Sequence, residues 1–152
     1  MNILLMYATY SGSTTAACQI AEQVLHAKGH QVTIKQVQEV QPDDFVAADV
    51  VVLASPSWDY HGEEGMPHED YLEAFKTFAG QTYPTKKFAV IGLGDNHFTK
   101  FCGAADHLEN WVKELQGELF IPSLRLDQYY FNETENGEKV KLWAAQLGDA
   151  LV

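Results

Sequence analysis

A hydroxyl-rich turn near the start of the chain is the segment best suited to bind a ligand. Residues 9–14 (TYSGST) follow an apolar run at residues 3–8 and precede a helical pattern of apolar residues at 16–25. A strand, a short turn and a helix place free backbone N–H groups and the positive end of a helix dipole at one point. The turn itself carries four side-chain hydroxyls, on Thr9, Ser11, Ser13 and Thr14.

The charge of this turn indicates which anion it would bind. The first cationic side chain of the chain is Lys28, so the turn offers only neutral donors. A triphosphate loop normally ends in Gly-Lys-Ser or Gly-Lys-Thr, because a lysine has to meet the β- and γ-phosphates. The absence of that ending favours a single terminal phosphate, and therefore a mononucleotide. Helix capping is the alternative, but a cap needs one hydroxyl and the turn supplies four.

Two further segments have the composition of binding loops. One begins Ser55-Pro56-Ser57-Trp58 and is expected to be a loop of about a dozen residues. The other begins Gly94-Asp95-Asn96 and extends to residue 103. Each of the three segments follows an apolar run of strand length. The carboxyl ends of parallel strands meet at one edge of a sheet, so we expect all three segments to open there.

The length and composition of the chain favour one globular domain spanning residues 1–152. The chain is 46% hydrophobic and 20% charged, which argues against disorder. Its net charge of −11 is expected to repel nucleic acid and anionic membranes and to favour basic protein partners. Cys18 and Cys102 form no CxxC pair, and neither a signal peptide nor a membrane span is evident, so the cytoplasm is the expected location.

Apolar runs alternate with helical patterns along the chain, which predicts an α/β fold with a parallel sheet. Residues 129–137 are expected to form a loop or a ragged hairpin before a closing helix. The five expected strands lie at residues 3–8, 31–37, 50–54, 88–93 and 119–126.

Taken in order, the three segments resemble the binding loops of short-chain flavodoxins. The family's phosphate loop, Thr-x-Ser/Thr-Gly-x-Thr, matches residues 9–14, and its aromatic loop matches Ser57-Trp58. Its third loop matches residues 94–98 (GDNHF) and 101–104 (FCGA). The resemblance covers essentially the whole chain. It implies a flavodoxin-like doubly wound five-stranded parallel sheet of order 2-1-3-4-5, with helices on both faces and FMN at the strand ends.

The resemblance also implies how the first loop would hold FMN. The four hydroxyls at Thr9, Ser11, Ser13 and Thr14 would donate to the phosphate together with backbone N–H groups. Gly12 would allow the close backbone approach that a Cβ blocks. Ser55 or Ser57 would add one more bond, and the sequence does not choose between them.

The other two loops would hold the flavin ring. Trp58 would stack on the isoalloxazine, which is flat and apolar. Phe98 is the candidate for the opposite face, with packing beneath its loop as the alternative. Backbone groups of Asp95, Lys100 and Cys102 would bind the pyrimidine edge. The rest of the predicted site flanks these residues and comprises Tyr10, Asp59, Tyr60, His61, Gly62, Gly94, His97 and Phe101.

One residue departs from the family pattern. A peptide just after the tryptophan commonly turns its carbonyl toward the flavin on one-electron reduction, and relatives commonly have glycine there, where this chain has Asp59. A positive φ costs a non-glycine residue ~1–2 kcal/mol. We therefore expect this flip to be less favourable here, with His61 and Gly62 as an alternative backbone route.

The implied function is that of a low-potential single-electron carrier with non-covalently bound FMN, and not of an enzyme. It would be a monomer that docks a basic reductase and an acceptor redox enzyme through an acidic face. Two alternatives stay open on the same fold: an FMN-dependent quinone or azo reductase, and an activator of a radical enzyme.

A flavin-free receiver domain would need acidic residues where this chain has Ala8-Thr9 and Ala54-Ser55. The spacing of His61, His68 and His97 does not match a zinc site.

Overall fold

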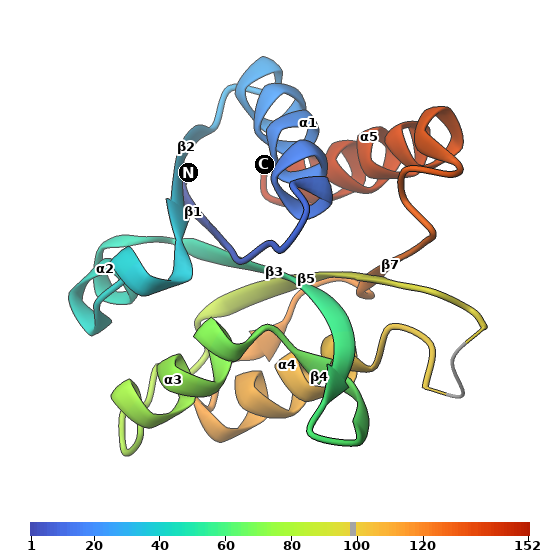
Figure 1. Cartoon of the computed structure of the whole chain (residues 1–152). Helices are drawn as coiled ribbons and strands as arrows, with labels where there is room; N and C mark the ends of the chain where they lie inside the picture. Colours follow the sequence, from blue (N-terminus) through green and yellow to red (C-terminus); the bar gives the residue numbers. More distant parts are fainter. Residues whose placement is uncertain (98–99) are drawn as a thin grey trace.

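The computed structural model describes residues 1–97 and 100–152. Its centre is a sheet in which parallel strands run in the order β2-β1-β3-β5-β6, with β7 also beside β5 (Figure 1). Only residues 120–123 separate β6 from β7, and both pair with β5, so together they form the fifth strand. The predicted order 2-1-3-4-5 is therefore confirmed. The strands are β1 (Asn2–Tyr7), β2 (Gln31–Gln36), β3 (Val50–Tyr60), β4 (Glu63–Pro67), β5 (Lys87–Gly94), β6 (Glu118–Leu119) and β7 (Leu124–Asp127).

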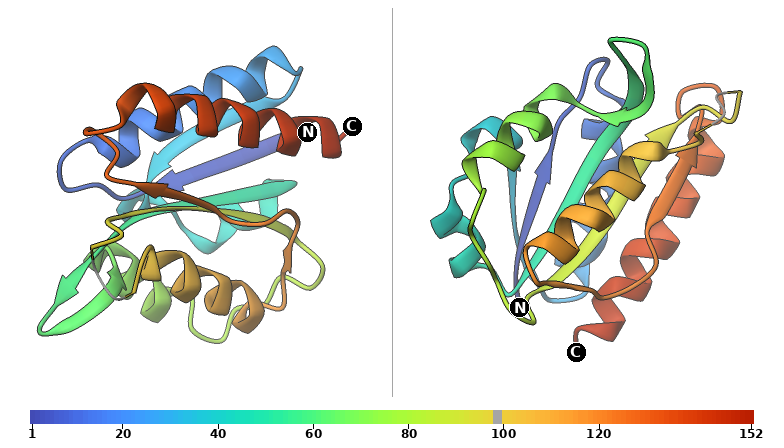
Figure 2. Two further views of the ribbon diagram at one scale, coloured as in Figure 1. Left: turned by 90° about the vertical axis from the view of Figure 1, so that its right-hand side faces the viewer. Right: turned by 90° about the horizontal axis from the view of Figure 1, so that it is seen from below.

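Helices cover both faces of the sheet, as predicted. In Figure 2 the helices α1 and α5 lie together on one face, and α3 and α4 lie on the other. The short helix α2 and the 3₁₀ turn η1 were not foreseen from the sequence. The helices are η1 (Val37–Glu39), α1 (Ser13–Ala27), α2 (Pro42–Ala47), α3 (Glu69–Thr77), α4 (Gly103–Glu114) and α5 (Glu133–Ala150).

The burial of each strand explains this layering. The central strands β1, β3 and β5 are apolar along most of their length, as strands covered on both faces are. Their side chains point alternately into two separate apolar clusters, one under α1 and α5 and one under α3 and α4. Strand β2 pairs only with β1 among the described strands and is partly exposed, so the predicted edge position is confirmed.

The expected loop after the third strand is instead a hairpin, which corrects that prediction. Strand β3 runs on to Tyr60 and pairs antiparallel with β4. The two residues between the strands, His61 and Gly62, have φ angles of 50° and 83°. Positive φ at both central residues is what a tight hairpin turn requires, and aromatic residues such as Trp58 favour strands.

The loop or ragged hairpin expected at residues 129–137 is also wrong in its second half, because α5 begins at Glu133. The Asn136 amide donates to the carbonyls of Asp127 and Tyr129, which fixes the start of the helix. A Cβ on Gly137 would meet Ile20 of α1 at an ordinary 3.6 Å, so this glycine lies in the α1–α5 contact. Tertiary packing here overrides the weak helix propensity of asparagine and glycine.

None of the helices in the described part of the chain has the length and apolar composition needed to cross a membrane.

Candidate functional site

The three predicted segments meet at one edge of the sheet, where β1, β5 and the parallel part of β3 end. The ring of Tyr10 in the first turn lies 4.8 Å from that of Trp58 in the hairpin. The hairpin and the loop after β5 close around a common hollow. It is lined by Ser57, Trp58, Asp59, Glu64, Gly65, Asp95, Lys100 and Cys102.

The first turn has the geometry of an open helix N-terminus. Gly12 is the N-cap residue of α1, with a φ of 90°, and no side chain of the described residues caps the helix. No acidic residue occupies the first turn of α1 either. The N–H groups of a first turn have no partner within the helix, so here they remain free for an anion.

A buried hydroxyl in the same turn lacks a partner. The side chain of Thr14 is fully buried, and its Oγ1 makes no hydrogen bond to any described residue. A buried hydroxyl without a partner costs about 1–3 kcal/mol. Such a group calls for an explanation, and a bound ligand atom is one that would supply the missing bond. The turn therefore fits a phosphate, because an unpaired hydroxyl and open N–H groups lie in the same few residues.

The structure separates the two serines between which the sequence did not choose. The hydroxyl of Ser55 donates to the Pro56 carbonyl at 2.8 Å and accepts the His68 N–H at 2.9 Å. Ser57 accepts the N–H of Ala104 at 3.0 Å. Within the described residues, Ser57 thus keeps a hydroxyl proton to donate, whereas the proton of Ser55 is already used.

The tryptophan of the hairpin is held in one orientation. The indole Nε1 of Trp58 donates to the Pro67 carbonyl across the hairpin at 3.1 Å. The rings of Tyr10 and Tyr60 lie 4.8 and 5.4 Å from the Trp58 ring. Asp59 follows at an irregularity in the β3–β4 pairing, and its side chain is exposed. At the turn of the hairpin, His61 and Gly62 have positive φ angles, whereas Asp59 does not. The backbone route through His61 and Gly62 stays a prediction.

The third loop is held by polar contacts to β7 and the turn after it. The Asp95 carboxylate accepts the backbone N–H of His97 at 2.8 Å and lies 2.7 Å from its ring nitrogen. The backbone N–H of His97, more than its ring, lowers the pKa of Asp95. Gln128 also donates to Asp95, at 3.3 Å. Lys100 is exposed and Phe101 is half-buried.

Phe98 lies outside the described residues, so its proposed position over the second face of the flavin stays a prediction.

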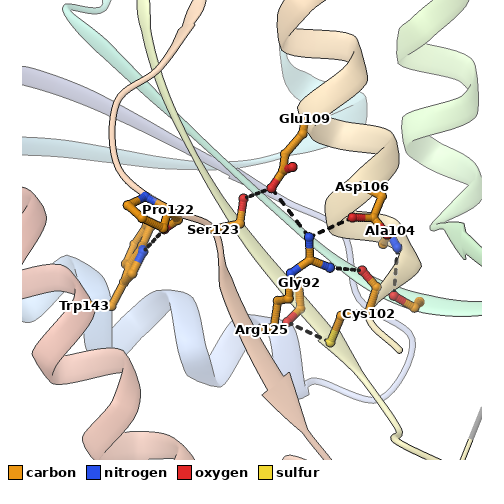
Figure 3. Close-up of polar contacts among 10 residues, drawn as sticks. Gly92, Cys102, Ala104, Asp106, Glu109, Pro122, Ser123, Arg125 and Trp143 are labelled. Carbon is orange, nitrogen blue, oxygen red and sulfur yellow. Dashed lines mark hydrogen bonds and ion pairs between the residues drawn. The ribbon is translucent and has the colours of Figure 1, made fainter. Parts of the chain in front are cut away.

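Cys102 has a left-handed backbone, with a φ of 50°, directly before α4. Arg125 of β7 donates to the Cys102 carbonyl at 3.1 Å and to the Asp106 carboxylate at 2.7 Å (Figure 3). The Cys102 thiol is 3.6 Å from the carbonyl oxygens of Gly92 and Leu126. Burial raises the pKa of this thiol to about 12. Arg125 thus fixes the peptide that follows the predicted pyrimidine-binding residues.

Two glycines join the hairpin to the third loop. A Cβ on Gly103 would lie 2.6 Å from the Gly65 carbonyl oxygen, and Gly65 itself has a φ of 73°. The bond from Ala104 to Ser57 lies beside this contact and also links α4 to the hairpin. The two elements that would enclose the flavin ring therefore pack as one unit.

Sequence reasoning missed three residues that position these loops. Arg125 holds the third loop, Tyr130 donates to the Ser11 carbonyl at 3.0 Å, and His68 stacks on Tyr10 at 4.0 Å. The sequence does show His68 just before an acidic helix start, where its Nδ1 accepts the Asp70 N–H. The other two contacts join distant parts of the chain, and no local pattern indicates them. No cluster of three or more His, Cys, Asp or Glu side chains suited to a metal occurs among the described residues.

Comparison with known proteins decides the family. The flavodoxin family model matches residues 5–139. The chain belongs to the flavodoxin family. Flavodoxins bind FMN and are electron-transfer proteins rather than enzymes. The predicted family, cofactor and class of function are therefore confirmed, and the reductase, activator and receiver-domain alternatives are not favoured.

Individual flavodoxins match over nearly the whole chain. A probable flavodoxin 2 of Bacillus subtilis is 32% identical, covering 92% of this chain and 88% of the relative. The crystal structure of oxidised flavodoxin 2 from Bacillus cereus is 28% identical, covers 95% of each chain and has a TM-score of 0.81. The Fusobacterium nucleatum flavodoxin bound to flavin mononucleotide has the same fold, with 17% identity, 97% coverage of each chain and a TM-score of 0.81.

The glycine contact leads to a first prediction. We expect Gly103→Ala to lower the free energy of unfolding by about 1–3 kcal/mol and to weaken FMN binding, because its Cβ would overlap the Gly65 backbone. Gly137→Ala is the matched control, since its Cβ has room and a helix gains about 0.5–1 kcal/mol from the change. Urea unfolding and FMN titration measure both effects. Equal stability and affinity in the two variants would contradict this account of the junction.

The buried cysteine leads to a second prediction. Because its pKa is raised, the Cys102 thiol is protonated at pH 8, and we expect it not to react with a thiol reagent in the folded protein. Cys18 is fully buried and should behave alike. Both should react once the chain is unfolded in denaturant. Rapid labelling of Cys102 in the native protein would show a reactive thiol at the site.

Proposed function

We propose that this chain carries single electrons on non-covalently bound FMN whose phosphate is held by the β1–α1 turn. The buried hydroxyl of Thr14, which has no partner among the described residues, is the observation that supports this most directly, because it lies in the turn that also offers open N–H groups. FMN accepts and releases electrons one at a time, and the protein supplies binding, orientation and charge. We further propose that residues 1–152 form a single flavodoxin-like domain.

In this proposal the phosphate is bound without a countercharge. The hydroxyls of Thr9, Ser11, Ser13 and Thr14 donate to it together with the first N–H groups of α1. Ser57 is the better of the two serine candidates, because its proton is uncommitted within the described residues.

The ring lies between the hairpin and the third loop. Trp58 covers one face in the orientation that its bond to Pro67 sets, and Phe98 remains our candidate for the other face. Backbone groups of Asp95, Lys100 and Cys102 bind the pyrimidine edge, and Arg125 keeps the last of these in place.

Partners should be basic. Flavodoxins pass electrons to redox partners, and carboxylates gather on the hairpin and the start of α3. We propose that a basic reductase and an acceptor enzyme dock there in turn on a monomer, with rates that fall as salt rises. The acidic residues of this docking surface are Asp59, Glu63, Glu64, Glu69 and Asp70.

Two buried free cysteines fit a reducing compartment, so we propose that the protein is located in the cytoplasm.

The orphaned hydroxyl leads to a third prediction. We expect Thr14→Val to weaken FMN binding by about tenfold or more, because a hydrogen bond to a charged group is worth about 1.5–3 kcal/mol. Without FMN the same variant should be as stable as the parent or more stable, because it removes a buried polar group to which no described residue bonds. Fluorescence titration with FMN and urea unfolding of the apoprotein measure the two effects.

Thr15→Val on the same helix is the control, and it should leave FMN affinity nearly unchanged. If Thr14→Val destabilised the apoprotein and left FMN affinity unchanged, the hydroxyl would have a structural role and the proposed phosphate site would be wrong.

Redox titration tests the proposed function itself. A carboxylate at about 10 Å, in an effective dielectric of about 40, opposes the negative charge of reduced flavin by ~0.8 kcal/mol, or ~35 mV. Several such groups, partly screened, should lower the potential of the second one-electron reduction by on the order of 100 mV relative to free FMN.

We expect Asp59→Asn to raise the potential of this second reduction by about 35 mV. Asp149→Asn serves as the control, since Asp149 pairs with Lys28 at the far end of α5.

The titration uses dithionite under anaerobic conditions, followed by visible absorption. Reduction should pass through two resolved one-electron steps, and NADPH alone should leave the flavin oxidised. A final couple no lower than that of free FMN would contradict the electrostatic argument. Rapid bleaching by NADPH alone would contradict the carrier function.

A further inference from the structure

The segment that links β7 to α5 contacts two of the three binding loops. The Asp127 carboxylate accepts the N–H of Asn96 at 2.9 Å, and the N–H of Gln128 donates to the Gly94 carbonyl at 2.9 Å. Two residues later, the hydroxyl of Tyr130 donates to the Ser11 carbonyl at 3.0 Å. The right-hand view of Figure 2 shows this orange segment passing the end of β5 before it enters α5. Residues 127–130 therefore bridge the third loop and the phosphate turn.

The contact with Tyr130 falls on a peptide that is held at both ends. The carbonyl of the Ser11–Gly12 peptide accepts the Tyr130 hydroxyl, and its N–H donates to Thr9 Oγ1 at 2.9 Å. The two groups of a peptide point in opposite directions, because the unit is planar and trans. With both ends bonded, the plane of this peptide is fixed.

The orientation of this peptide decides what the turn can offer an anion. Its N–H is used by Thr9, so it is not a donor to the ligand. Thr9 Oγ1 accepts that bond, and no described residue accepts the Thr9 hydroxyl proton, so this proton can donate outward. The fixed plane also sets the path of the chain through Gly12, whose φ is 90°, into the first N–H groups of α1. The hydrogen bond from Tyr130 thus sets the positions of the Thr9 hydroxyl and the first N–H groups of α1, which Tyr130 does not contact.

The tyrosine lies directly against the turn. A Cβ on Gly12 would come within 3.3 Å of the Tyr130 hydroxyl oxygen, so a side chain there would press on it. Tyr130 is 51% exposed, and its ring meets Tyr129 at 5.8 Å. Because half of its surface remains in water, core packing does not explain its position, whereas its hydrogen bond to the turn does.

We propose that Tyr130 is a positioning residue for the phosphate, ordering the β1–α1 turn for binding from the opposite side of the Ser11–Gly12 peptide. This inference rests on the proposed function, because it assumes that the turn binds the phosphate of FMN. Its effect is preorganisation: the turn is held in its binding conformation before the ligand arrives. Loss of the bond should therefore weaken phosphate binding and leave contacts with the flavin ring unchanged.

The test compares FMN with riboflavin, which carries the same ring without the phosphate. We expect Tyr130→Phe to weaken FMN binding about three- to tenfold, as befits one hydrogen bond at a partly exposed site, and to leave riboflavin affinity unchanged. Tyr83→Phe is the matched control, because the Tyr83 hydroxyl also donates to a backbone carbonyl, that of Pro42 at 3.3 Å. Fluorescence titrations give the affinities, and thermal unfolding of each apoprotein shows whether the fold is intact.

Each outcome has a definite meaning. A loss confined to FMN in Tyr130→Phe, and absent in Tyr83→Phe, supports the proposal. Unchanged FMN affinity in Tyr130→Phe, or an equal loss for FMN and riboflavin, overturns it while the FMN site of the parent protein stands. If the parent protein itself binds FMN no better than riboflavin, the proposed phosphate site fails, and this inference fails with it.

Discussion

The whole arrangement depends on hydrogen-bond donors at the β1–α1 corner for which the described residues supply no partner. A helix start exposes N–H groups that must be satisfied by a cap, by water or by a ligand. Here the N-cap is a glycine with no side chain to supply a cap, and the neighbouring Thr14 hydroxyl is buried with no partner among the described residues. Leaving such groups unpaired is costly for the free protein, and in the proposed function a phosphate offsets that cost. The local conformation of this turn thus leaves donors that a ligand would satisfy.

The remaining elements place the ring of Trp58 near that corner. Parallel strands β1, β3 and β5 end at the same edge, so the segments that follow them meet there although they are far apart in sequence. The extension of β3 into a hairpin carries Trp58 out beyond the sheet, and the Gly65–Gly103 contact seats this hairpin on the start of α4. In the proposed function, the excess of carboxylates also discourages negative charge on the cofactor and attracts basic partners.

Much of this could be predicted from the sequence, because local patterns determine it. The apolar runs of β1, β3 and β5 have the length and continuity of strands buried on both faces, and the hydroxyls of residues 9–14 lie within one turn. The hairpin was missed because the turn at His61-Gly62 lies between polar residues that also suit a loop. The start of α5 was missed because Asn136 and Gly137 are weak helix formers, and their stabilising contacts come from β7 and α1. Tyr130 could not have been found, since its partner lies 119 residues away in the chain.

The dependence of FMN affinity on ionic strength tests the central claim most directly. We propose that neutral donors hold the phosphate in a chain of net charge −11, in which case salt screens only repulsion between protein and ligand. Titration of the apoprotein with FMN, from about 0.01 M to about 0.2 M ionic strength, should therefore show affinity that is constant or rises. A marked fall in affinity with added salt would show that a cationic side chain binds the phosphate, and would contradict the account.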